Sequence, residues 1–538
     1  MKNKILTITI ILFCSACGNF LEPNSSTEFV PEDANALNEM LLGEAYPMPS
    51  STMRFNVFLN MLDDDVTCAD FEPMQYEQTR EKVQAAYTWQ SNIYELMEEV
   101  EVSDGITNLY KNYYTPILGC NAALDYLHTV SGTEDELNYV QAQALALRSF
   151  YYFRLVNIYG QPYNYNKNAL GVPLKLNSNM ETTAPVRQTV GEVYEQIVKD
   201  LTEAERLYKK LPENLQWTAS GNRVNLPFVQ LLLSRVYLYM ENWEKAAEYA
   251  EAVISNPNLS LYNLTTIISK TSGTGTGGTG TGGTGTGNNT PIYRLYIHAK
   301  TNPEVIWRYG SPSDDASGSW IFLKGSDEDN EETLPVFKAS DDLLEIFDKP
   351  NSGEDTRKLG YILYSQSKDK KTTIPAAIGK ISQNSEGIIK STDFTRSFRL
   401  AEAYLNFAEA KAMLSQNGDA TGRAQAIEKI NELRRYRVHD SKDISTLVPD
   451  AESLVNFIRD ERRRELCFED HRWFDLRRYG MPSITHEWRA DETTTLVYTL
   501  EKEDNNYTIP LPEAAIEANT ALVQNPLAPK NRPGVVKN

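Results

Sequence analysis

Three consecutive carboxylates, Asp63, Asp64 and Asp65, are the most obvious candidates for chemistry in this sequence. Two carboxylates at a suitable separation can hydrolyse a glycosidic bond. Adjacent residues on a strand or turn point in different directions, however, so these three are poorly placed to act as an acid/base pair. We expect a solvated loop here, with a calcium-binding turn as the alternative, and we predict no metal site.

Histidine and cysteine offer no further chemistry by their spacing. The histidines lack the i,i+4 pairing and the neighbouring cysteine pair that zinc sites use. Besides Cys17, the mature chain would keep Cys68, Cys120 and Cys467, an odd and widely spaced set that we interpret as buried thiols. The sequence also lacks a GxSxG elbow, an HExxH motif and a Walker loop. We therefore predict no cofactor and no enzymatic activity.

Aromatic side chains are candidates for binding, because the flat faces of Trp and Tyr pack against the C–H groups of sugar rings. Trp320 follows the polar residues 314–318, a setting that does not require a buried indole, so we predict an exposed platform. Trp89, with Tyr87 and Asn92 close by, is a second candidate, for which an ordinary loop anchor is the alternative. The predicted ligand-binding residues are therefore Trp89, Trp320, Tyr87 and Asn92.

Residues 459–478 carry the densest run of charge, with arginines and carboxylates interleaved at i,i+3 and i,i+4 spacings. Apolar side chains such as Leu466, Trp473 and Phe474 supply a side that can be buried. We expect the guanidinium groups to fasten this helical region to its neighbours through bidentate bonds to carboxylates and carbonyls. An anion-binding site is the alternative.

The elements that must position these groups are mostly helical from about residue 31 to residue 264, where apolar residues recur at three- and four-residue spacings. Thr189 and Glu192 form a capping box that starts one helix. Residues 229–257 are typical of a tetratricopeptide-like helix pair with a turn at Glu241-Asn242. Because one pair leaves an apolar face exposed, several pairs must stack; a generic helical bundle is the alternative. The other predicted pairs are 139–159 with 190–211, and 398–414 with 423–436.

The chain changes character after residue 270. Residues 271–290 repeat a Thr-Gly-Thr-Gly-Gly unit that cannot bury apolar surface, so we predict a disordered insert. Residues 292–297 and 304–309 are predicted strands, followed by polar loops through residue 326. Because loops on a rigid scaffold usually carry recognition, we expect the ligand on this loop region and on residues 56–90.

The N-terminus has the features of an export signal. A basic lead and the short apolar stretch 5–13 precede small residues and then Cys17. This pattern resembles a bacterial lipobox, in which Cys17 carries diacylglycerol; an ordinary secretory signal is the alternative. The chain has 53 basic and 73 acidic residues, and its net charge of −20 disfavours nucleic acid as a partner. We predict a signal peptide over residues 1–16 and a lipid-anchored protein.

Several motifs together make the sequence similar to the SusD/RagB family of Bacteroidetes lipoproteins. They lie at the predicted anchor, in one helix, in the charged run and near the C-terminus. These motifs are residues 17–21 (CGNFL), 399–410 (RLAEAYLNFAEA), 461–466 (ERRREL), 471–478 (HRWFDLRR), 507–512 (YTIPLP) and 524–526 (QNP). The similarity extends over nearly the whole mature chain. The Thr/Gly tract and the ending 527–538 depart from the family pattern, and we expect both departures to matter little for function.

The resemblance implies a mainly α protein with one SusD-like domain over residues 17–538. Tetratricopeptide-like pairs would form the part 31–264, and the part 291–538 would hold irregular loops, a small β portion and C-terminal helices. The resemblance also implies an outer-membrane lipoprotein at the cell surface that binds a glycan and delivers it to a SusC-like TonB-dependent transporter. RagB-like peptide uptake is the alternative. The sequence does not exclude a helical-repeat adaptor or a cryptic glycoside hydrolase.

Overall fold

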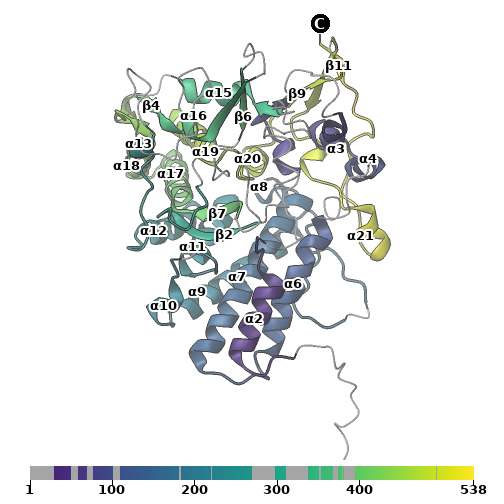
Figure 1. Ribbon diagram of the computed structural model, residues 1–538, viewed down its shortest axis with the longest axis vertical. Coiled ribbons are helices and arrows are strands. Elements are labelled where there is room, and N and C mark those ends of the chain that lie inside the picture. Colours follow the sequence, from purple (N-terminus) through teal and green to yellow (C-terminus); the bar gives the residue numbers. More distant parts are fainter. Residues whose placement is uncertain are drawn as a thin grey trace, which may run out of the picture.

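The computed structural model shows a mainly helical molecule (Figure 1). The structure describes residues 30–49, 58–68, 77–100, 109–180, 183–219, 221–268, 297–310, 337–349, 353–366, 373–377, 380, 394–491 and 493–537. The predicted signal peptide, the anchor Cys17, the predicted insert 271–290 and Trp320 lie outside these ranges. Within them, no helix combines the length and the apolar character that a membrane span requires.

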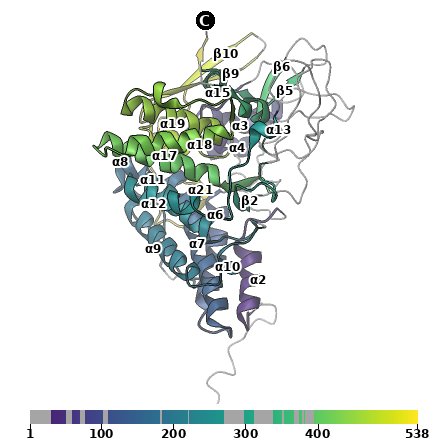
Figure 2. The same cartoon turned by 90° about the vertical axis from the view of Figure 1, so that its left-hand side faces the viewer.

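Helices stack on one another largely in chain order and build the scaffold. In this stack α6 packs on α7, α7 on α9, α9 on α11, and α11 on α12, while α2 lies against α6 and α7. Figure 2 shows the layers from α2 at the foot of the molecule to α19 near the top. The helices are α2 (Ala34–Ala45), α6 (Leu109–Tyr126), α7 (Glu134–Tyr159), α9 (Val190–Tyr208), α11 (Leu226–Tyr239) and α12 (Trp243–Ile254).

Local sequence signals explain where these helices begin. Thr189 Oγ accepts a hydrogen bond from Glu192 N (3.2 Å), and Glu192 Oε2 accepts one from Thr189 N (2.8 Å), which confirms the predicted capping box. Glu241 adopts a positive φ of 58° in the turn between α11 and α12, and Asn242 caps α12 by accepting a hydrogen bond from Lys245 N. The predicted helix pair at residues 229–257 is therefore present.

A second predicted helix pair extends this stack, although it follows the predicted loop region in the sequence. It consists of α17 (Leu400–Gln416) and α18 (Gly422–Arg435), and α17 also packs against α12 and α19 (Ala451–Leu466). Through α12, the stack of the N-terminal part is thus continuous in space with the C-terminal helices. The predicted class, a mainly α scaffold of tetratricopeptide-like pairs, is confirmed.

Short strands pair into small antiparallel sheets beside this scaffold. Within the described ranges, β1 pairs with β3, β2 with β7, β4 with β8, β5 with β6, and β10 lies between β9 and β11. The predicted strand at 304–309 is β2, whereas most of the predicted strand at 292–297 lies outside the described residues. The strands are β1 (Val66–Cys68), β2 (Val305–Tyr309), β3 (Phe337–Ala339), β4 (Glu354–Asp355), β5 (Ile362–Gln366), β6 (Thr373–Ala377), β7 (Arg396–Arg399), β8 (Val438–His439), β9 (Ile484–Arg489), β10 (Thr495–Leu500) and β11 (Val535–Val536).

Shorter helices connect the scaffold to these sheets, and one of them, α15, packs against α19. The shorter α-helices are α3 (Glu77–Tyr87), α4 (Ile93–Glu99), α8 (Tyr163–Asn166), α10 (Glu213–Gln216), α13 (Leu264–Ile267), α15 (Asp341–Asp348), α16 (Thr356–Tyr361), α20 (Arg472–Arg478) and α21 (Glu513–Ala518). The 3₁₀ turns are Leu59–Met61, Ile444–Thr446 and Asn505–Tyr507.

A fully buried network of ion pairs joins α19 to distant parts of the chain. Glu465 accepts hydrogen bonds from Arg357 (3.1 Å), from Arg399 (2.9 Å) and from Nε of Arg437 (2.9 Å), and each of these side chains is at most 2% exposed. Burial alone would raise the pKa of Glu465, but the three guanidinium groups hold it well below its usual range. The carboxylate is therefore ionised and shared among three segments of the chain.

A second set of buried ion pairs fastens α19 and α20 to α17. Arg478 donates two hydrogen bonds to the carboxylate of Glu409, at 2.6 Å and 2.8 Å, and Arg462 donates a third at 3.1 Å. Despite burial, these guanidinium groups lower the pKa of Glu409 to about 2. The expectation that the arginines of residues 459–478 attach this region to its neighbours is confirmed.

One continuous hydrophobic cluster runs through the molecule from Leu37 to Leu522. Cys68, Cys120 and Cys467 are free thiols buried in this interior, as predicted, and burial raises the pKa of Cys467 to about 12. A thiol with so high a pKa stays protonated at neutral pH and is a poor nucleophile. The cysteines therefore contribute to packing.

Candidate functional site

The stretch 56–90, one of the two predicted to carry recognition, contributes a strand to a short antiparallel pair, which we call the β1–β3 ribbon. Strand β1 belongs to the stretch 56–90, and β3 starts at the first described residue after the segment that carries Trp320. Cys68 lies opposite Phe337 in the register of this antiparallel pair. Directly after β3, Ser340 N donates a hydrogen bond to Asp65 O (2.9 Å), and Ser340 Oγ donates one to Asp64 O (2.6 Å). Both acceptors lie in the turn that precedes β1. The ribbon therefore ties the stretch 56–90 to residues 337–340, which follow the predicted loop region in the chain.

The turn that leads into β1 contains the three aspartates, and it is not a solvated loop. Asp63 is 2% exposed and Asp65 is 1% exposed. Arg472 donates two hydrogen bonds to the carboxylate of Asp64, at 2.6 Å and 2.8 Å, and Arg463 donates one to Asp65 at 2.7 Å. The expectation of a solvated loop is wrong, because the arginines of α19 and α20 draw this turn into the interior.

The three carboxyl groups of this turn differ in the direction in which the protein shifts their pKa. Burial and the neighbouring carboxylates Asp65 and Asp64 raise the pKa of Asp63 well above its ordinary value. Burial would also raise the pKa of Asp64, but Arg463 and Arg472 outweigh it and lower that pKa. Burial raises the pKa of Asp65 although Arg463 opposes the shift. The two arginines thus balance the negative charge of the turn. Their ion pairs anchor β1 and leave little negative charge to bind a cation.

Aromatic rings pack beneath the ribbon, at the junction of α3 and β9. The imidazole of His486 lies between the rings of Tyr87 and Trp89, with ring centroids 4.2 Å and 4.1 Å away. Tyr87 Oη donates a hydrogen bond to Glu487 O (3.1 Å), and Trp89 Nε1 donates one to Leu62 O (2.9 Å). Burial lowers the pKa of His486 to about 4, so its ring is neutral at physiological pH. The stack joins α3, β9 and the aspartate turn into one rigid unit.

These positions correct the expectation of an exposed platform at Trp89. Trp89 is 1% exposed and Tyr87 is completely buried, so the faces of both rings are covered by the protein itself. The loop-anchor alternative therefore describes Trp89. Asn92 precedes α4 without capping it, and its buried Oδ1 has no hydrogen-bond partner among the described residues. Its role in ligand binding, like that of Trp320, stays a prediction.

The C-terminal tail holds the loop after Trp89, a function that the sequence did not reveal. Arg532 N donates to Gln90 Oε1 (2.9 Å), and Gln90 Nε2 donates back to Arg532 O (3.2 Å). The Arg532 guanidinium donates to Thr499 O (2.6 Å) and to Asp504 (2.8 Å). Because β11 also pairs with β10, the tail is part of the fold, and only the β-branched pair in β11 signals this in the sequence.

The described residues present neither a metal cluster nor an exposed pair of carboxylates at the ribbon. No three His, Cys, Asp or Glu side chains among them gather in a way that could hold a metal ion. The carboxylates of Asp64 and Asp65 are bound by arginines, and that of Asp63 is buried, so the turn is shielded from a substrate.

Two family models match the sequence over different parts of the chain. The model described as "SusD family" matches residues 304–527, and the model described as "Starch-binding associating with outer membrane" matches residues 48–238. Among curated relatives, the SusD-like protein P2 of Formosa agariphila is 25% identical over 78% of this chain and 80% of its own length. The SusD-like protein P25 of the same organism is 21% identical over 98% of both chains.

Solved structures share the fold over almost the entire chain. A SusD superfamily protein from Bacteroides vulgatus superposes with a TM-score of 0.67 at 18% identity, covering 93% of this chain and 100% of that chain. A SusD-like carbohydrate binding protein from the same species gives a TM-score of 0.60 at 19% identity, covering 91% and 97%. The stacked helical pairs and the small sheets thus define a SusD-like fold. Along most of its length the chain is therefore similar to proteins of the SusD/RagB family.

Proposed function

We propose that this protein binds a glycan at the cell surface and passes it to a SusC-like TonB-dependent transporter of the outer membrane. The observation that carries the proposal is the β1–β3 ribbon, which pairs the stretch 56–90 with β3, the first described strand after Trp320 in the sequence. The starch-binding description of one family model and the carbohydrate-binding description of a structural relative support a glycan as the ligand. Lipidation of Cys17 would hold the protein at the membrane.

We propose binding without bond cleavage. Glycoside hydrolysis requires an acid and a second carboxylate that both face the scissile bond. In the aspartate turn, the carboxylates of Asp64 and Asp65 instead face Arg472 and Arg463. Release of new reducing ends from the bound glycan by purified protein would contradict this proposal.

The test uses protein that lacks residues 1–17, screened on a glycan array and then measured by isothermal titration calorimetry. Removing a large ring from a sugar platform takes away about 1.5 to 3 kcal/mol, so Trp320→Ala should weaken binding roughly tenfold to a hundredfold. Deleting residues 274–288 is the matched control and should leave both affinity and thermal stability unchanged. Equal affinity of Trp320→Ala and the parent would remove Trp320 from the site. Binding of peptides but of no glycan would favour the peptide alternative.

A further inference from the structure

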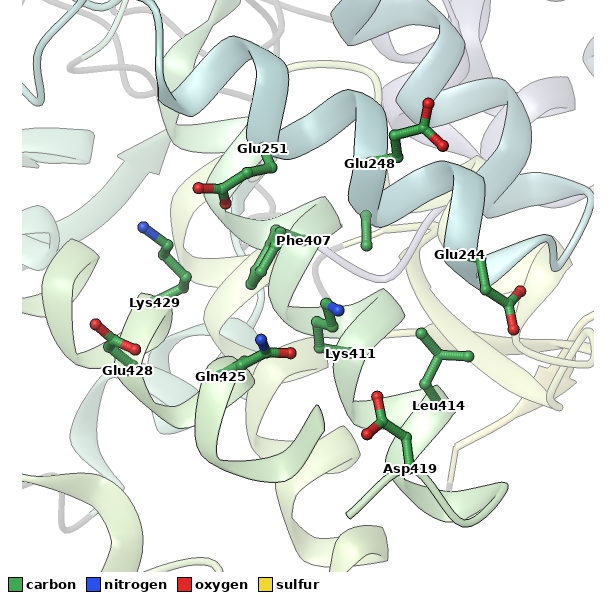
Figure 3. Close-up of a pocket in the computed structure, with 11 residues that line it drawn as sticks. Glu244, Glu248, Glu251, Phe407, Lys411, Leu414, Asp419, Gln425, Glu428 and Lys429 are labelled. Carbon is green, nitrogen blue, oxygen red and sulfur yellow. The ribbon is translucent and has the colours of Figure 1, made fainter. Parts of the chain in front are cut away.

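Tyr165 has the open ring face that a sugar platform requires. Among the side chains that the structure describes, it is the only aromatic one that is exposed, at 49%. It lies on α8, and residues 164–168 are all exposed. In contrast, the open pocket of about 850 Å³ between α12, α17 and α18 is lined by a single aromatic residue, Phe407, whose side chain is 7% exposed (Figure 3). A sugar ring can therefore stack on Tyr165 but not on the wall of that pocket.

Helix α8 holds Tyr165 in a fixed position, although it is only one turn long. Tyr165 N donates a hydrogen bond to Pro162 O (3.0 Å), which closes the turn. Asn164 Nδ2 donates to Arg478 O at the end of α20 (2.9 Å), and Figure 1 shows α8 beside α20. Tyr165 Oη donates to Glu503 Oε2 (3.3 Å). Because these contacts hold the ring before a ligand arrives, little entropy is lost when it binds.

Two glutamates flank α8 at backbone positions that are unusual for this residue type. Glu241 has a φ of 58° and Glu503 has a φ of 59°, in the left-handed region that Gly or Asn adopts more easily. Glu241 Oε1 accepts a hydrogen bond from Asn164 Nδ2 (2.9 Å), as Glu503 Oε2 does from Tyr165. Both glutamates are exposed. Each therefore has a second carboxylate oxygen at the surface, where it can accept a hydrogen bond from a ligand.

The second oxygen of Glu503 has one competitor. Lys502 Nζ lies 3.6 Å from Glu503 Oε1, and its side chain is 70% exposed. An exposed ion pair of this kind is weak, because water screens it. A hydroxyl group of a ligand can therefore replace the lysine at this oxygen.

Amide side chains complete a polar border around the ring. Asn166 Nδ2 donates a hydrogen bond to Gln161 Oε1 (2.9 Å), and the other polar group of each amide can bond a ligand. Sugars have C–H groups on their ring faces and hydroxyl groups at their edges, so an aromatic face bordered by amides and carboxylates matches them. We propose that this surface, which we call the α8 surface, binds a sugar residue of a glycan. The α8 surface consists of Gln161, Asn164, Tyr165, Asn166, Glu241 and Glu503.

This inference rests on the proposed function, because it takes a glycan as the ligand, and it adds a contact that does not involve Trp320. Helix α20 connects the α8 surface to the β1–β3 ribbon. Arg472 at the start of α20 binds Asp64, and Arg478 at its end accepts the hydrogen bond from α8. A helix of seven residues spans roughly 10 Å. The aspartate turn and the α8 surface are thus attached to opposite ends of one short helix.

The test compares variants of the protein that lacks residues 1–17 on an array of α- and β-linked glucans, mannans and galactans. The glycan with the strongest signal is then titrated by isothermal titration calorimetry. Tyr165→Ala removes the ring and should weaken binding about tenfold, whereas Tyr165→Phe and Tyr165→Trp keep a ring face and should stay within about threefold of the parent. Met180→Ala, which removes a 99% exposed apolar side chain from the loop before α9, is the matched control and should leave affinity unchanged.

The outcomes separate this inference from the proposed function. Equal affinity of Tyr165→Ala and Met180→Ala for a glycan that the parent binds would overturn the inference and leave the proposed function intact. A weaker affinity of Tyr165→Ala accompanied by a lower melting temperature would indicate a structural role for the ring and would also overturn it. A loss in Tyr165→Ala that adds to the loss in Trp320→Ala would support two separate contacts with one ligand. A parent that binds no glycan would contradict both the proposed function and this inference.

Discussion

Replacing Glu465 by Gln tests the claim that the buried ion pairs hold α19 in place. Gln has almost the same volume as Glu, so the change removes a charge without leaving a cavity. The three arginine partners would then stay buried without the carboxylate that they share. These partners are Arg357, Arg399 and Arg437. Removing one partner of a buried ion pair destabilises a protein by about 3 to 5 kcal/mol. We expect a loss of this size in the free energy of unfolding, measured by urea denaturation followed by circular dichroism.

The neighbouring residues supply a matched control for this experiment. Asp460 lies on the same helix and pairs with Lys349 at 2.8 Å, but the two side chains are 32% and 47% exposed. Exposed ion pairs contribute about 0 to 1 kcal/mol, so Asp460→Asn should change stability little. If Glu465→Gln and Asp460→Asn unfold at the same urea concentration, the buried network does not stabilise the fold as argued. If Glu465→Gln does not fold, Glu304→Gln, which loses two guanidinium partners, gives the same comparison.

Three further predictions follow from other contacts. Because the pKa values of Glu409 and Glu469 are lowered from 4.5 to about 2, their stabilisation is complete above pH 4.5 and is lost as pH falls towards 2, which acid titration followed by fluorescence would show. Gly119→Ala should lower the melting temperature, since its Cβ would lie 2.8 Å from the backbone of α2, whereas Gly43→Ala, with nothing within 4 Å, should raise it. Arg532→Ala should speed hydrogen exchange in residues 89–95, and unchanged exchange there would contradict the tail contact.

The helical scaffold could be predicted because its signals are local. The Thr189 capping box, the turn at Glu241-Asn242 and the three- and four-residue apolar spacing each depend on a few adjacent residues. The family resemblance rested in large part on residues of α17, α19 and α20, which the structure shows as helices, whereas the anchor motif 17–21 lies outside the described residues. Charge interleaving in residues 459–478 predicted the role of the arginines correctly, although it gave none of their partners.

The candidate site was predicted less well because its determinants are distant in sequence. Nothing near Asp63 or Asp65 shows that Arg463 will bury the turn, since these residues lie about 400 positions apart in the chain. Trp89 appeared suited to exposure because its neighbours are polar, but the ring fills a gap beside His486. Sequence reasoning treated the tail as incidental because a two-residue strand carries almost no periodic signal.

The long separation between α19 and its partners also affects how the polypeptide matures. Asp65 meets Arg463 of α19 only after 398 further residues have been made, and Glu304, in the buried network around Glu465, meets Arg437 only after 133. Until then these carboxylates stay hydrated, because an unpaired charge is expensive to remove from water. The early helices can associate as soon as they are made, but the buried ion pairs of α19 cannot form until α19 itself has been made. A chain that ends before α19 therefore lacks the guanidinium partners of Asp64 and Asp65 and should leave the aspartate turn in water.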